Sequence, residues 1–278
     1  MASRHGNARL DVIAGVSALV LVLAVLIPGV ERARESARRT VSKGHLKKWA
    51  LAIYNYEDVY DRLPAGGWIL DDGTERHGWV TALLPYLDSS PLFDSFDLHK
   101  PWHHPRNQPI CRWSLPLALY PNDRRSETAE GYGLCHYAVN PSLMHRNSSL
   151  RLDEIATGLA NTLLAGEALG DFRPWACPWN WRPIESPLNQ DAGGYGHAGR
   201  DSTYFAIADG QVRLINNDID PVALRQLAFG GVVNPEEGIA RPPIPPAYPS
   251  TKIRHRFDPP RKSKAWSPPP EWEKPETD

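Results

Sequence analysis

Three histidines lie close together in this chain, and their spacing could suit a metal ion. His99, His103 and His104 fall within six residues, and imidazole nitrogens are common zinc ligands. A shared site needs a backbone that brings the three rings together. Pro101 and Pro105 interrupt any helix that would do so. We therefore expect no metal site in this segment.

A second pair, His197 and Asp209, has the residue types of a general base and the carboxylate that orients it. Asp209-Gly210 also lies between two apolar runs, where it predicts a hairpin turn. Glu167 ends another apolar run, and we expect a structural or ion-pair role for it. We find no nucleophile elbow, phosphate-binding loop or paired cysteine ligand set. We therefore expect no enzyme, no catalytic residue and no cofactor, and interpret His197, Asp209 and Gly210 as architectural.

The elements that would position these residues are mainly strands. Residues 203–208 and 211–215 flank the Asp-Gly turn and read as a hairpin, with positive φ expected at both turn residues. Alternation would bury one of two sets: Tyr204, Ala206 and Ala208, or Phe205 and Ile207. Short apolar runs between Gly and Pro residues predict that 63–232 is one β-rich domain with long loops. Residues 221–230 could form a last short helix that ends on Gly.

The N-terminal part of the chain predicts one long helix. Residues 12–30 carry no charge and span about 28 Å as a helix, close to the thickness of a bilayer core. Residues 31–62 continue as an amphipathic helix, whose apolar stripe consists of Leu46, Trp49, Ile53, Tyr56 and Tyr60. Pro28 either kinks this helix or marks the exit from the membrane. The chain is therefore expected to be anchored in a membrane.

Residues 1–11 form a short leader before the apolar run. The arrangement of Gly6, Asn7 and Asp11 resembles a prepilin processing site, in which a peptidase cuts after the Gly. The resemblance implies that the acid at the fifth mature position pairs with the N-terminus of a neighbouring subunit. An unpaired carboxylate at the edge of an apolar helix is costly, which gives Asp11 a reason to be paired. The match departs from the usual pattern, because the acid is usually Glu and the residue after Gly is usually Phe or Met. A plain signal anchor remains the alternative.

Four separated segments resemble the bacterial family known as domain of unknown function 1559: residues 31–67, 77–107, 152–167 and 196–215. The resemblance implies a prepilin-type N-terminus and a pilin-like fold. It also implies a C-terminal motif of His, nine residues and Asp-Gly, whereas eleven residues separate His197 from Asp209 here. Tyr120-Pro121-Asn122-Asp123 stands where the family usually has Cys-Pro-Ser-Asp. The family has no established activity, so the resemblance implies architecture and location.

The distribution of charge gives conflicting predictions of orientation. Basic residues gather after the apolar run (Arg32, Arg34, Arg38, Arg39, Lys43, Lys47 and Lys48), whereas only Arg4 and Arg9 precede it. Counting alone would keep the domain in the cytoplasm. The prepilin resemblance implies the opposite, and Glu31 and Glu35 offset part of the cluster, so we predict export across the inner (cytoplasmic) membrane. With 31 basic and 32 acidic residues, no bulk charge indicates nucleic acid binding.

The cysteines and the C-terminal residues give two further predictions. Cys111, Cys135 and Cys177 could form one disulfide and a buried thiol, or three free thiols. Residues 233–278 are rich in proline, with twelve of the 27 prolines after residue 234, and predict a disordered tail.

Together these features predict an α+β, pilin-like fold. A long N-terminal helix, with a transmembrane and an amphipathic part, would pack on a mainly antiparallel β domain. The expected function is that of a membrane-anchored, pilin-like or pseudopilin-like structural or assembly protein, which self-associates through its helix. The alternative is a membrane-tethered module that binds a small ligand, glycan or protein through an aromatic surface of Trp68, Trp79, Trp102, Trp175, Trp179 and Trp181.

Overall fold

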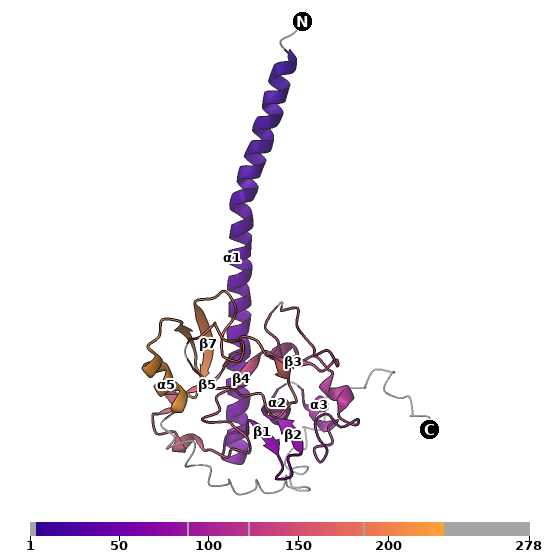
Figure 1. Ribbon diagram of the computed structural model, residues 1–278, viewed down its shortest axis with the longest axis vertical. Helices are drawn as coiled ribbons and strands as arrows, with labels where there is room; N and C mark the ends of the chain where they lie inside the picture. Colours follow the sequence, from indigo (N-terminus) through magenta and orange to yellow (C-terminus); the bar gives the residue numbers. More distant parts are fainter. Residues whose placement is uncertain (1–3, 88, 122, 186, 231–278) are drawn as a thin grey trace, which may run out of the picture. The chain divides into compact units, whose positions relative to one another are not determined.

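The longest element of the protein is helix α1 (Arg4–Tyr60), as a computed structural model of residues 4–87, 89–121, 123–185 and 187–230 describes it (Figure 1). Pro28 lies inside α1, and the helix continues on both sides of it. Gly6, Asn7 and Asp11 lie in the N-terminal part of the helix. The predicted tail, 233–278, lies outside the described residues.

The chain divides into two compact units, of which the first ends at Lys43. In this unit α1 exposes large apolar side chains to its surroundings: Val16, Leu19, Val20, Leu21, Leu26, Ile27 and Val30. This part of α1 is long and apolar enough to cross a bilayer. Exposed apolar surface of this extent is unfavourable in water, so the helix is a candidate membrane span.

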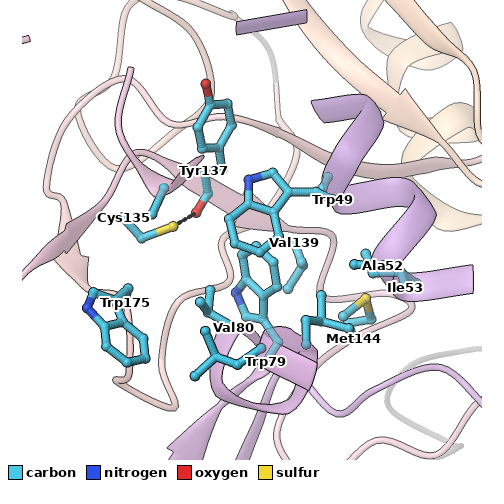
Figure 2. Packing of buried hydrophobic residues seen from close by; sticks show 14 of the residues in the cluster. Trp49, Ala52, Ile53, Trp79, Val80, Cys135, Tyr137, Val139, Met144 and Trp175 are labelled. Carbon is cyan, nitrogen blue, oxygen red and sulfur yellow. Dashed lines mark hydrogen bonds between the residues drawn. The ribbon is translucent and has the colours of Figure 1, made fainter. Parts of the chain in front are cut away.

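The second unit, which begins at Gly44, is called the head domain here. The C-terminal part of α1 forms the centre of its core, because Leu46, Trp49 and Ile53 are at most 1% exposed. Trp49 packs edge-on against Trp79 of the short helix α2 (Trp79–Leu83), with 4.9 Å between ring centroids (Figure 2). The predicted apolar stripe is thus confirmed at these three residues, whereas its last two, Tyr56 and Tyr60, are only partly buried.

The main sheet of the head domain is antiparallel throughout. Its strand order is β4 (Tyr137–Val139), β5 (Leu163–Glu167), β7 (Ser202–Ile207) and β8 (Val212–Asn216). Two small antiparallel pairs flank it, β1 (Gly67–Ile69) with β2 (Glu75–Gly78) and β3 (Leu134–Cys135) with β6 (Arg173–Pro174). The predicted α+β class is therefore confirmed.

Strand β7 is buried on both faces, whereas the sequence predicted burial of one set of residues or the other. Ala206 and Ala208 belong to the core cluster that contains Trp49. Phe205 and Ile207 belong to a second cluster, which includes Leu224 of helix α5 (Pro221–Phe229). The sheet separates two cores, and α5 covers the second. As predicted, α5 ends at Gly230, which has a left-handed conformation.

The β7–β8 hairpin forms as predicted, but its turn is of a different type. Gly210 has φ +82°, whereas Asp209 is not among the residues with positive φ. The Gly210 amide donates to the Ile207 carbonyl (2.9 Å) and the Ile207 amide donates to the Gln211 carbonyl (2.8 Å). These bonds describe a type I turn followed by a glycine bulge, in which only the third loop residue needs positive φ. The prediction of positive φ at Asp209 was wrong.

Long loops and short helical turns connect these strands. They include α3 (Ser90–Asp94), α4 (Gln108–Cys111) and four 3-10 turns (Leu84–Tyr86, Pro116–Ala118, Leu152–Glu154 and Leu159–Asn161). The short helices α2, α3 and α4 were not predicted, because runs of four or five residues are too short to show a helical period.

Candidate functional site

A cavity of about 80 Å³ lies in the head domain, at the end of the main sheet. Its walls come from four segments: the 120–125 loop, the β3–β4 junction, the residues that follow β5, and the loop before β7. The lining residues are Tyr120, Asp123, Arg125, His136, Glu167, Ala168, Leu169, Phe172, Gly196, His197 and Ala198.

Strand pairing brings these segments together. Tyr137 of β4 pairs with Glu167 of β5, which places their neighbours His136 and Ala168 side by side, with the Ala168 amide donating to the His136 carbonyl (2.9 Å). The Gly196 amide donates to the Glu167 carbonyl (2.8 Å), and this bond holds the loop before β7 against the end of β5. Backbone hydrogen bonds therefore define the shape of the cavity.

A buried ion pair, of which Glu167 lines the cavity, lies at its floor. The Arg200 Nη1 and Glu167 Oε2 atoms lie 3.6 Å apart, and the side chains are 4% and 2% exposed. The Tyr204 amide donates to Glu167 Oε2 (3.2 Å), and Arg200 also donates to the hydroxyl of Tyr120. Glu167 thus has the ion-pair role predicted for it. Removal of one partner would leave a buried charge uncompensated.

His136 is the most deeply buried histidine in the cavity wall, with 1% of its surface exposed. Its Nδ1 accepts a hydrogen bond from the Tyr120 amide (3.1 Å), so the proton of the neutral ring is on Nε2. Nε2 is buried and has no hydrogen-bond partner among the described residues. The ring stacks on Phe172, with 3.9 Å between centroids and 21° between planes.

Burial determines the charge state of His136. It lowers the pKa of the ring to about 4, although the Asp123 carboxylate and the nearby Arg125 carbonyl act in the opposite direction. His136 is therefore neutral near pH 7.

The rim of the cavity carries a second ion pair. Arg125 Nη2 donates to Asp123 Oδ2 at 2.7 Å and Arg125 Nε donates to Oδ1 at 3.0 Å, a bidentate arrangement. Burial alone would raise the pKa of Asp123, but hydrogen bonds from Arg125 outweigh it and leave that pKa lowered. The Arg125 guanidinium also lies over the Phe172 ring, 4.4 Å from its centroid. Each acid in the cavity wall therefore has a basic partner.

Comparison with known proteins places part of this site in a family. Residues 31–145 match the model of a family described as protein of unknown function (DUF1559). Over this segment the chain is similar to the DUF1559 family. No curated protein and no solved structure matches the chain. The DUF1559 segment includes the head-domain part of α1, the 120–125 loop and His136, whereas Glu167 and His197 lie beyond it.

His197 and Asp209 do not form the acid–base pair considered from the sequence. They lie at opposite ends of β7, whose six residues span about 20 Å. The His197 ring instead packs on Tyr120, with 4.6 Å between ring centroids, and lines the cavity. Asp209 Oδ1 accepts from the Gln211 amide within the turn (2.9 Å). Of the three motif residues, only His197 belongs to the cavity.

Other candidates from the sequence lie elsewhere in the head domain. The His99 amide bonds to Asp97, and His104 Nδ1 accepts from the Arg106 amide. Among the described residues, no three His, Cys, Asp or Glu side chains are grouped as metal ligands would be. The cysteines are three free thiols, all buried, and burial raises the pKa of each. Four of the six tryptophans considered as a binding surface are buried in the core: Trp68, Trp79, Trp102 and Trp175.

Sequence reasoning missed most of the cavity. His136, Phe172 and Arg200 were not singled out, and Tyr120 was noted only for its departure from the family box. One signal was present for His136, because a single histidine interrupts the apolar run from Leu134 to Val139. A histidine within a buried strand pair has to be neutral, and its donor needs a partner.

Proposed function

We propose that this chain is a membrane-anchored, pilin-like structural or assembly protein that displays its head domain outside the cytoplasm. One observation carries the proposal: the part of α1 before Lys43 is long enough to span a bilayer and exposes eight large apolar side chains. The DUF1559 match supports the same architecture. Leader removal after Gly6 and pairing of Asp11 with a neighbouring subunit complete the proposal.

Ion pairs along α1 support the outward orientation. Glu31 pairs with Arg34 (2.9 Å), and Glu35 lies 3.7 Å from Arg38 and 3.4 Å from Arg39. These contacts offset part of the positive charge that would otherwise hold this flank in the cytoplasm. The remaining basic residues on this flank act against export.

Two measurements test the proposal. Mass spectrometry of the mature protein should find a chain that starts at Asn7. Protease added to spheroplasts should remove the head domain, with detergent-treated spheroplasts as the positive control and a cytoplasmic protein as the negative control. An intact N-terminus would refute prepilin-type processing, and full protection of the head domain would refute export.

A second candidate function is a membrane-tethered binding module. The observation that favours it is the cavity, whose wall combines paired charges with aromatic rings. The aromatic surface first considered for this role gives little support, because most of its tryptophans are in the core.

A further inference from the structure

The segment of α1 that follows the uncharged run carries an excess of positive charge. Its five basic and two acidic residues, a net charge of +3, are Arg32, Arg34, Arg38, Arg39, Lys43, Glu31 and Glu35. Glu31 pairs with Arg34, and Glu35 is shared between Arg38 and Arg39. Two carboxylates cannot neutralise five cations, so positive charge remains directly beside the candidate membrane span.

Part of this charge lies on one face of the helix. At about 3.6 residues per turn, Arg32, Ser36, Arg39 and Lys43 fall within about 60° of one another around the axis of α1. These four residues are called the basic face here. Arg32 and Ser36 are exposed, and Arg39 and Lys43 are partly exposed. Arg32 makes no ion pair within the part of the chain that the structure describes.

The basic face begins at the level of the lipid headgroups when residues 12–30 span the bilayer. At roughly 1.5 Å per residue, Arg32 lies about 3 Å beyond Val30, Ser36 about 9 Å and Arg39 about 14 Å. The headgroup layer is about 5–8 Å thick on each side, so Arg32 lies within it and Ser36 at its outer edge. Helical side chains lean towards the N-terminus, which for α1 is towards the bilayer. The Arg39 guanidinium thus comes within a Debye length, about 8 Å, of the lipid phosphates.

The side chains of the basic face suit a phosphate group. A guanidinium group binds phosphate oxygens through paired N–H donors, and the Ser36 hydroxyl, one turn after Arg32, supplies another donor. The contact between Arg39 and Glu35 is partly exposed and 3.4 Å long, and such pairs are weak enough to give way to a phosphate. A zwitterionic headgroup brings its own ammonium group, whereas an anionic headgroup needs a cation. The basic face should therefore prefer anionic lipids.

We propose that the basic face of α1 binds the phosphate of an anionic phospholipid at the membrane surface. Arg32 and Ser36 contact this phosphate, while Arg39 and Lys43 add electrostatic attraction. In the orientation proposed above, the lipid belongs to the outer leaflet of the inner membrane. The inference rests on the membrane anchor of the proposed function, and it is independent of export, leader processing and assembly.

A competition between two lipids tests the proposal. The full chain, in dodecyl maltoside micelles at pH 7, is mixed with equal amounts of phosphatidylglycerol and phosphatidylcholine that carry the same acyl chains. Native mass spectrometry then counts the molecules of each lipid that stay bound. We expect bound phosphatidylglycerol to exceed bound phosphatidylcholine at least about threefold, because only the charge of the headgroup differs.

Two double variants locate the bound lipid. Arg32→Gln/Arg39→Gln removes two positive charges from the basic face and should lower the ratio of the two lipids at least about twofold. Lys47→Gln/Lys48→Gln removes the same charge about 26 Å of helix beyond Val30 and should leave the ratio unchanged. All four side chains are at least partly exposed, so neither variant should disturb folding. Inorganic phosphate in tenfold excess over the lipid should not displace it, because phosphate lacks the acyl chains that hold the lipid beside α1.

The possible results separate this inference from the anchor. Equal binding of the two lipids to the wild type would refute the inference and leave the anchor standing. Binding of neither lipid would refute both. An unchanged ratio for the arginine variant, or an equal loss in the lysine variant, would mean that the basic face does not select the lipid. Displacement by inorganic phosphate would identify a site for soluble anions instead.

Discussion

His77 should make the head domain sensitive to mild acid. It lies in β2, is fully buried, and packs edge-on against Phe96, with 5.3 Å between ring centroids. Neither ring nitrogen makes a hydrogen bond within the described residues. Burial lowers the pKa of His77 to about 4, against the smaller opposing effect of the Asp97 and Lys100 carbonyls. The ring is therefore neutral in the folded protein near pH 7.

The pH dependence of the free energy of unfolding follows from the difference in the pKa of His77 between the folded and unfolded states. In the unfolded chain a histidine titrates near pH 6.5, so between about pH 6.5 and pH 4 the unfolded state binds more protons than the folded state. The stabilisation is present above pH 6.5 and is lost as the pH falls towards 4. With a folded pKa of about 4, His77 alone lowers the free energy of unfolding by about 2 kcal/mol between pH 7 and pH 4.5. His136 adds a loss of similar size, because its pKa is lowered in the same way.

The variant His77→Phe isolates the contribution of His77. It keeps an aromatic ring beside Phe96 and removes the titrating group, so the loss between pH 7 and pH 4.5 should shrink by roughly 2 kcal/mol. Urea unfolding of the full chain in detergent, followed by tryptophan fluorescence, measures it. The tryptophan fluorescence reports on the head domain and the C-terminal residues, because none of the ten tryptophans precedes Trp49. His99→Gln, at an exposed site, is the matched control. If His77→Phe loses as much stability in acid as the wild type, the reasoning is refuted.

Other contacts give three more predictions. Gly210→Val should cost about 1–2 kcal/mol in urea unfolding, because φ at this turn is +82°, and His197→Ala should cost less; a neutral Gly210→Val would contradict this. Arg200→Met should cost about 3–5 kcal/mol by removing the cation beside the buried Glu167 carboxylate, and Arg200→Met/Glu167→Leu should recover most of that loss; a cost below about 1 kcal/mol would argue against a buried pair. Asp11→Ala should reduce crosslinked oligomers and leave membrane fractionation intact, and unchanged crosslinking would argue against assembly through α1.

The features predicted well from the sequence are those with a local physical cause. The uncharged run 12–30 and the apolar stripe of residues 46–60 predicted α1, because the spacing of apolar residues along one helix can be read from the local sequence. The Asp-Gly pair between apolar runs predicted the β7–β8 hairpin. Pro221 and Gly230 predicted the bounds of α5, where Asp220 also caps the first turn by accepting from the Val222 amide.

Details of conformation were less predictable even within these elements. The sequence indicated a turn at Asp209-Gly210, but the turn type depends on the loop length that the strand register selects. Alternation in β7 suggested one buried face, and packing buried both, because α1 residues lie in the cluster on one side of the sheet and α5 residues in the cluster on the other. Register and layer order are properties of the whole sheet.

The cavity was decided by tertiary structure alone. Its lining residues extend from Tyr120 to Ala198, and no local pattern links them. Strand pairing places His136 beside Ala168, and the Gly196 amide then closes the loop onto Glu167. Only this arrangement removes water from His136, pairs Glu167 with Arg200 and moves His197 away from Asp209. Burial and charge pairing depend on distance in space, so residue types and spacing could indicate the anchor but not the site.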